Sequence, residues 1–263
     1  MCVMAIFIMI RNNTRNTVMP DYTVEMRARC RIESGEEISN QYMRPDTPAY
    51  LRRLVMREKW FFDCSCSRCM SPTELGSYYG SVLCSRTRCG GALVSSDTSD
   101  NDADHECQSC GERVSMVKIR SILSEAESVM ETVESGDGVI EHYERVLFRL
   151  SSLLHPGNYL MLEIKQKLGL LYGNIFPHTI NKMKTPARER KVQVCEEVIR
   201  ELTVLERGVS EMMIVMMTEV AKMKTEEYLS DNPDPDGRRG MMARFMMIDN
   251  MLTLTNCLQL YNK

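Results

Sequence analysis

Seven cysteines in a short segment constrain the fold of this chain more than any other feature. They lie between positions 64 and 110 in closely spaced groups, whereas the whole chain of 263 residues holds eleven cysteines. In a secreted protein such groups suggest disulfides, but in a reducing compartment they indicate metal binding. The groups are Cys64/Cys66/Cys69, Cys84/Cys89 and Cys107/Cys110.

The last four of these cysteines have the layout of a zinc ribbon. Two pairs, spaced C-x4-C and C-x2-C, are each followed by glycine and are separated by a polar loop. Glycine permits the tight turns that bring backbone amides close to thiolate sulfurs. Because four thiolates fill every position of a tetrahedral zinc ion, we predict a structural zinc held by Cys84, Cys89, Cys107 and Cys110. Zinc binding and folding should be coupled, since so small a segment has little core of its own.

The polar loop between the two pairs is acidic. Its segment 97–104 lacks the glycine and the closing glutamate of a calcium loop, so we predict a solvated loop. We expect His105 to be a loop residue rather than a ligand, because four thiolates already complete the site.

The first three cysteines form an incomplete set. Cys64, Cys66 and Cys69 supply three thiolates at C-x-C-x2-C spacing, and a structural zinc needs four ligands. Either Cys30 or Cys2 supplies the fourth, or the site is weak or empty. Three unmetallated cysteines are the alternative interpretation.

Composition and charge favour a soluble globular protein without nucleic-acid or membrane partners. Hydrophobic residues make up 43% and charged residues 26%, and the chain is long enough for one large or two modest domains. The net charge is −3 and the pI about 5.9, which argues against nucleic-acid binding. The apolar residues 1–10 lack the features of a signal peptide and are too short to span a membrane, so we expect a buried strand. We predict a cytoplasmic or nuclear protein with reduced thiols.

The first sixty residues predict a small sheet that leads into a helix. Apolar residues alternate from Tyr22 to Cys30, which predicts a half-buried strand. A turn at 34–37, a second strand at 38–42 and a basic amphipathic helix at 49–59 follow.

From Val117 onward the apolar spacing becomes helical. Short breaks separate the stripes, which predicts antiparallel helix pairs, and tetratricopeptide-like (TPR-like) hairpins are plausible although no clean 34-residue period is present. Methionines are concentrated near 212–223 and 241–251. They either fill the core or form an adaptable peptide-binding face, and core filling is the simpler interpretation.

Several stretches resemble the end of a SET domain and the post-SET segment of SET-and-MYND (SMYD) protein-lysine methyltransferases. They are Gly35-Glu36-Glu37-Ile38, Tyr42, Leu51-Arg52-Arg53 and Lys59-Trp60-Phe61-Phe62 with Cys64, Cys66 and Cys69. The ribbon and the helical tail look like the arthropod msta-like branch. The resemblance implies an α+β, mostly α fold: the C-terminal part of SET (1–56), a post-SET cysteine segment (57–70), a four-cysteine ribbon-like insert (71–115) and a helical, TPR-like domain (116–263).

The resemblance also implies roles for single residues. In this family S-adenosylmethionine and a lysine meet in a narrow channel, where Tyr42 would align the lysine amine and Phe61 or Phe62 would wall the channel. Asn13 alone matches the cofactor-holding motif Asn-His-Ser-Cys-x-Pro-Asn, whose cysteine is the family's fourth zinc ligand.

The chain departs from that motif, and this changes the function that we expect. Ile10 stands where the family has the fourth zinc-ligating cysteine, and the front of the SET fold and the MYND module have no counterpart in the chain. We therefore expect an N-terminally shortened member that does not transfer methyl groups alone. The alternative is a non-catalytic zinc and helical-repeat module that binds a protein or peptide, either through a lysine or on its helical face.

Overall fold

The computed structural model describes residues 13–39, 43–131, 138–174, 183–206, 208 and 210–231. The chain separates into two compact units. The first comprises 1–12, 37–164 and 204–206, and the second comprises 13–36, 165–203 and 207–263. The boundaries between the four segments expected from the sequence remain predictions.

The ribbon segment of the first unit forms an antiparallel sheet with the strand order β3-β4-β5-β6. The strands are β3 (Val82–Leu83), β4 (Ala92–Ser95), β5 (His105–Cys107) and β6 (Arg113–Val114). Leu93 and Val94 of β4 are buried, and Leu93 lies opposite Cys107 in the register. The expectation that His105 is a loop residue was wrong, because it begins β5 and pairs with Val114.

Helix α1 (Ala49–Val55) continues into a π-helical turn, η1 (Met56–Trp60). The helix predicted for 49–59 is thus confirmed, but its last turn is wider than an α-helix. Phe61 ends the turn with a left-handed backbone (φ 55°), a conformation that a bulky residue rarely adopts. Single π-helical turns of this kind occur frequently at functional sites.

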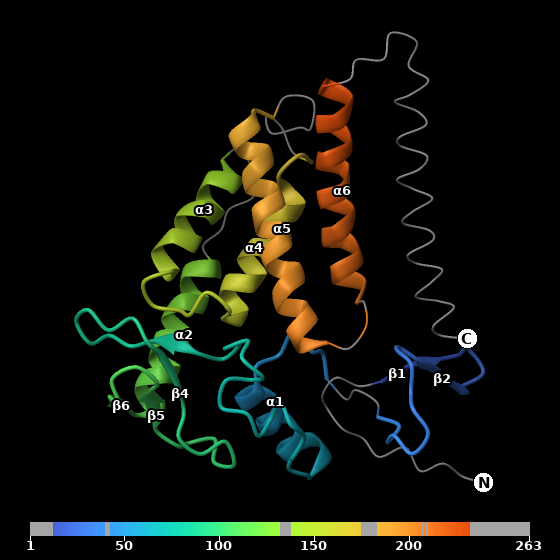
Figure 1. Cartoon of the computed structure of the whole chain (residues 1–263). Helices are drawn as coiled ribbons and strands as arrows, with labels where there is room; N and C mark the ends of the chain where they lie inside the picture. The colour runs from blue at the N-terminus through green and yellow to red at the C-terminus, as the bar shows by residue number, and fades with distance from the viewer. Residues whose placement is uncertain are drawn as a thin grey trace. The chain divides into compact units, whose positions relative to one another are not determined.

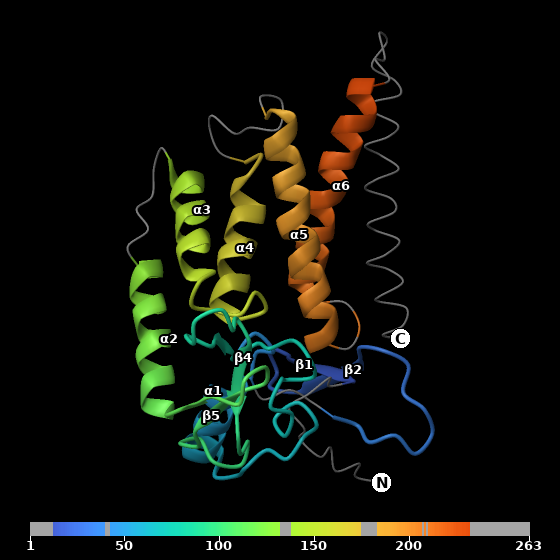
Figure 2. The ribbon, with the colours of Figure 1, turned by 60° about the vertical axis from the view of Figure 1, so that its left-hand side comes forward.

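Helices α2 (Met116–Glu131) and α3 (Val139–Leu150) contact each other, and α3 lies higher than α2 in both views (Figures 1 and 2). The predicted apolar stripe of α2 is buried, as is that of α3. The buried side chains are Ile119, Leu123, Ala126, Met130, Ile140, Val146, Leu147 and Leu150. The start of helix α4 (Tyr159–Leu171) is joined to the sheet, because the amide of buried Asn158 donates to the Ser81 carbonyl at 2.9 Å.

In the second unit, α5 (Thr185–Leu205) runs antiparallel to the end of α4, and α6 (Glu211–Asp231) lies beside α5 in both views. Lys165 of α4 pairs with Glu197 of α5 at 2.8 Å. Gly169 lets α4 approach closely, since a Cβ there would lie 2.9 Å from the Cys195 sulfur. The buried side chains facing this interior are Val194, Cys195, Val198, Leu202, Met213, Met216 and Met223. Core filling by methionine is confirmed for the last three, whereas 241–251 lie outside the described residues.

The remaining β-structure of the second unit is a hairpin of β1 (Thr14–Val18) and β2 (Val24–Ala28). The sequence predicted a strand from Tyr22 with one buried face, and this is partly wrong. Tyr22 lies in the turn (φ 64°), while Val24 and Met26 are exposed. In the described part of the chain the hairpin is a two-stranded sheet without a covering layer, so alternation alone does not bury its apolar face.

The next predicted turn is confirmed, with Gly35 at φ 86°. The strand expected at 38–42 is absent at Ile38 and Ser39, and 40–42 lie outside the described residues. The predicted α+β, mostly α fold class is confirmed, whereas TPR-like packing remains a prediction. In the described ranges, every helix is too short or too polar to cross a membrane.

Candidate metal centres

The four ribbon cysteines converge on one point. Their sulfur atoms all lie within 4.8 Å of one another, with Cys84 and Cys110 3.8 Å apart and Cys89 and Cys107 3.5 Å apart. A tetrahedral zinc with Zn–S distances of about 2.3 Å places its sulfurs about 3.8 Å from each other. The donor set and its spacing therefore fit a zinc ion.

Backbone amides point at these sulfurs. The amides of Arg86, Gly91 and Glu112 each donate to the cysteine two residues before them. At Cys110 this hydrogen bond is the largest cause that lowers the thiol pKa, to about 7, whereas at Cys89 the neighbouring thiols outweigh it and raise the pKa. Gly91 has no room for a side chain, because a Cβ would lie 2.7 Å from the Cys107 sulfur. The sequence-based expectation that glycine lets the backbone approach the sulfurs applies at this position.

His105 lies near this cluster without joining its four sulfurs. Burial lowers the pKa of its imidazole, which favours the neutral form. Its Nδ1 atom has no hydrogen-bond partner in the part of the chain that the structure describes.

The three remaining cysteines form a second cluster in the same unit. The sulfurs of Cys64, Cys66 and Cys69 lie within 4.8 Å of one another, and Cys64 and Cys66 are 3.1 Å apart. Buried Met56 and half-buried Phe62 pack against them. Within the described ranges this group contains three ligand-type residues. Of the candidate fourth ligands, Cys30 belongs to the second unit, while Cys2, like Ile10, lies outside the described residues.

A buried charged network supports this second cluster, and sequence reasoning missed it. Glu74 accepts hydrogen bonds from Arg52 at 3.1 Å and from Arg68 at 2.8 Å. Arg52 also lies 3.6 Å from the Cys69 sulfur, at hydrogen-bonding distance. The sequence showed only a basic helix at 49–59, and periodicity does not reveal which arginines are turned inward.

The structure describes some, but not all, of the residues for which the family resemblance implies a role in methyl transfer. Tyr42 lies outside the described residues. Phe61 is 88% exposed, whereas Phe62 packs against the three-cysteine cluster. Asn13 is buried at the start of the hairpin, where its amide donates to Glu36 at 3.3 Å. Their roles in methyl transfer and cofactor binding remain predictions.

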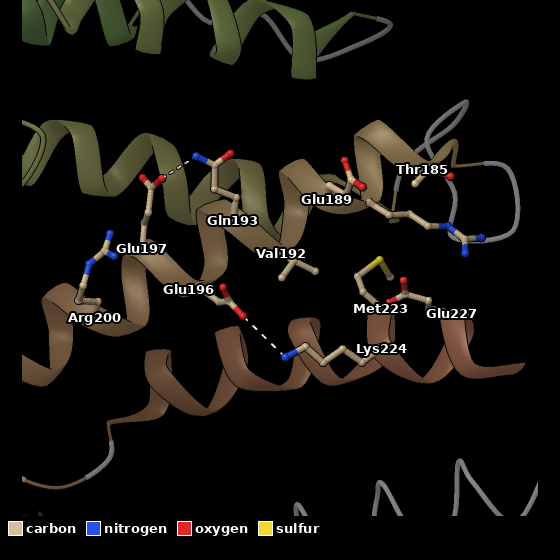
Figure 3. Close-up of a pocket in the computed structure, with 11 residues that line it drawn as sticks. Thr185, Glu189, Val192, Gln193, Glu196, Glu197, Arg200, Met223, Lys224 and Glu227 are labelled. Carbon is tan, nitrogen blue, oxygen red and sulfur yellow. Dashed lines mark hydrogen bonds and ion pairs between the residues drawn. The ribbon is translucent and has the colours of Figure 1, made fainter. Parts of the chain in front are cut away.

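The second unit contains a cavity of about 710 Å³ between α5 and α6 (Figure 3). Val192 and Met223 form its apolar part, and Glu196 pairs with Lys224 at 3.7 Å across it. The other charged side chains that line it are Arg188, Glu189, Glu197, Arg200 and Glu227. Pockets for drug-sized ligands are mostly apolar, so this lining suits a polar segment better than a small apolar molecule.

These features define a mostly helical protein with two cysteine clusters, one of which has the complete donor set of a structural zinc site. No model of a known protein family matches the chain. Over 88 residues, 34% of its length, the chain is 30% identical to a Drosophila melanogaster protein named SET domain-containing protein SmydA-8, isoform B. The match covers 20% of that relative. This similarity supports a SET/SMYD-like relationship.

Proposed function

We propose that this chain is a SMYD-like SET-domain protein in which zinc ions organise the region after the SET segment and helices bind a protein or peptide. In this proposal both cysteine clusters hold structural zinc, and the chain alone does not transfer methyl groups. The observation that carries the proposal is the convergence of Cys84, Cys89, Cys107 and Cys110 at distances suited to tetrahedral zinc.

Zinc in the ribbon would stabilise the fold rather than perform chemistry. The ribbon strands are two to four residues long and bury few side chains, so metal binding must supply part of their folding energy. Four thiolates leave no open position at which a zinc-bound water would act as a nucleophile.

The SET/SMYD relationship is the reason for proposing the methyltransferase class. Phe61 is a local candidate for a functional residue, since it is an exposed aromatic residue held in a left-handed backbone. In the proposed reaction Phe61 or Phe62 would flank the target lysine, and Tyr42 would orient its amine. Bound S-adenosylmethionine would supply the methyl group. The expectation that this chain is inactive rests on its divergence from the cofactor motif around Asn13.

Calorimetry with S-adenosylmethionine tests the catalytic part of the proposal. Zinc-loaded protein titrated with millimolar cofactor is expected to give no saturable heat. Saturable binding would contradict the expectation that the divergent cofactor motif no longer holds S-adenosylmethionine, while leaving the proposed zinc sites unaffected. We also propose a cytoplasmic or nuclear location, which imaging of a tagged full chain would test.

The α5–α6 cavity favours a second role as a peptide-binding module. Four glutamates and three basic residues line it, so it suits a lysine-containing peptide. A fluorescent peptide of alternating lysine and alanine is expected to bind the wild type and to bind more weakly after Glu196→Lys. Glu211→Lys, at the exposed start of α6, is the control. Equal binding by all three proteins would remove the cavity from the proposal.

A further inference from the structure

Three charged side chains are buried together beside the three-cysteine cluster. Arg52 and Arg68 are at most 1% exposed and Glu74 is 4% exposed. A buried charge is costly unless other charges and hydrogen bonds compensate for it. Two arginines and one glutamate leave a net charge of plus one, so this network lacks one negative charge.

The negative charge lies in the neighbouring cluster. A divalent zinc ion bound by three thiolates and a neutral fourth ligand, such as water, carries a net charge of minus one. Arg52 connects the two groups directly, because its Nη2 atom lies 3.6 Å from the Cys69 sulfur. The network and a zinc-loaded cluster therefore sum to zero, whereas either one alone leaves a buried net charge.

The backbone around Glu74 is arranged to hold the network in place. Glu74 and Leu75 both have left-handed backbones (φ 48° and 63°), which costs energy in non-glycine residues. In this conformation the Glu74 carboxylate also accepts the Ala49 amide at 2.9 Å, at the start of α1. Glu74 thus fixes the helix that carries Arg52 as well as the arginine itself.

Arg68 is held with the same precision. Its guanidinium donates to the Pro45 carbonyl at 2.7 Å and lies 5.3 Å from the centre of the Tyr79 ring. Arg52 in turn donates to the Thr47 carbonyl. Since each arginine has several fixed partners, the position of the positive charge is determined by the fold and not by the metal.

We propose that Arg52 is a positioning residue of the three-cysteine metal centre: it holds Cys69 in place and supplies the charge that a divalent ion with three thiolates requires. This inference rests on the proposed function, which places zinc in that cluster. It goes further because it attributes the zinc affinity of the site to the buried Arg52 guanidinium, which the Glu74 carboxylate and the Thr47 carbonyl hold in place.

Site-resolved thiol labelling of the full chain tests this inference. The protein is equilibrated in buffers of defined free zinc and pulsed with an alkylating reagent, and mass spectrometry compares the peptides carrying Cys64/Cys66 and Cys107/Cys110. Arg52→Met is expected to weaken zinc binding at the first site about 10–100-fold, the usual effect of removing a partner of a metal ligand. The ribbon site should remain unchanged and reports that the protein is folded.

Matched variants separate charge from packing. Arg57→Met removes an exposed arginine that pairs with Asp63, next to the cluster, and should leave both sites unchanged. Arg52→Lys keeps the charge and should retain more affinity than Arg52→Met. Glu74→Gln keeps an acceptor oxygen for the Ala49 amide and the arginines but removes the negative charge. The more positive network should favour the zinc-loaded cluster, so zinc should bind at least as tightly as in the wild type. A purely structural role instead predicts a loss for Glu74→Gln similar to that for Arg52→Met.

The outcomes distinguish this inference from the proposed function. If wild-type Cys64 and Cys66 are alkylated at every zinc concentration, the proposed zinc at this cluster fails. If zinc protects them equally in wild type and Arg52→Met, that zinc stands and the role of Arg52 is refuted. If Arg52→Met also loses the ribbon site through unfolding, the comparison of Arg52→Lys and Glu74→Gln with the wild type decides.

Discussion

Replacing Lys191 by methionine should destabilise the second unit strongly. The Lys191 side chain is fully buried in α5, and its ammonium donates to the Glu219 carboxylate and to the Tyr172 carbonyl. Removing one partner of a buried ion pair costs about 3–5 kcal/mol. Because Glu219 keeps its contact with Lys222 at 2.6 Å, we expect about 3 kcal/mol, the lower end of that range.

Urea unfolding followed by circular dichroism measures this loss. With a denaturant slope of about 2 kcal/mol/M, 3 kcal/mol lowers the midpoint by about 1.5 M. Because a chain with two units need not unfold in one step, alkylation of Cys195, which is buried in α5, provides a probe specific to the second unit.

Two further variants test the physical reasoning. Lys191→Met combined with Glu219→Met should recover most of the loss, because an apolar pair of similar volume often replaces a buried ion pair without net cost. Lys224→Met breaks the exposed pair with Glu196 on the same two helices and should cost at most about 0.5 kcal/mol. A double variant as unstable as the single variant, or equal effects at Lys191 and Lys224, would refute the account.

Three further predictions concern Glu219, Gly91 and Phe61. Burial alone would raise the pKa of Glu219, but hydrogen bonds from Lys191 and Lys222 outweigh it and lower the pKa. The stabilisation is therefore complete above pH 4.5, the ordinary glutamate value, and is lost as the pH falls through the lower folded value. Urea midpoints measured across this range should fall in the wild type and change less in the Lys191→Met/Glu219→Met variant. Gly91→Ala should weaken zinc binding by the ribbon, measured by chelator competition, because its Cβ would lie 2.5 Å from the Ser109 hydroxyl; unchanged affinity would show that the turn adjusts. Phe61→Gly should raise the thermal midpoint, because glycine tolerates the left-handed backbone and the lost side chain is 88% exposed; a lower midpoint would mean that Phe61 contributes packing.

Local patterns predicted the ribbon and the described helices well. Cysteine spacing together with the glycines predicted which four sulfurs converge, because zinc knuckles are determined by a few neighbouring residues. The apolar stripe of α2 likewise predicted its buried face, since a period of 3.6 residues follows directly from helix geometry.

Properties that depend on distant residues could not be predicted in this way. The alternation around Val24 and Met26 predicted a strand correctly, but burial of its face requires a second layer, which alternation does not encode. The network of Arg52, Arg68 and Glu74 joins residues up to 22 positions apart, and the motifs that contain Arg52 and Arg68 do not indicate that both pair with Glu74. The left-handed backbone at Phe61 and Glu74 was also not predicted, because neither position holds the glycine that usually marks this conformation.

Native mass spectrometry of the purified full chain tests the central claim most directly. We expect a folded protein that carries two zinc ions, one at Cys84/Cys89/Cys107/Cys110 and one at Cys64/Cys66/Cys69. Cys110→Ser should remove one of the two ions and unfold the ribbon. A folded wild-type protein without zinc, and with all seven thiols free to react, would contradict the account.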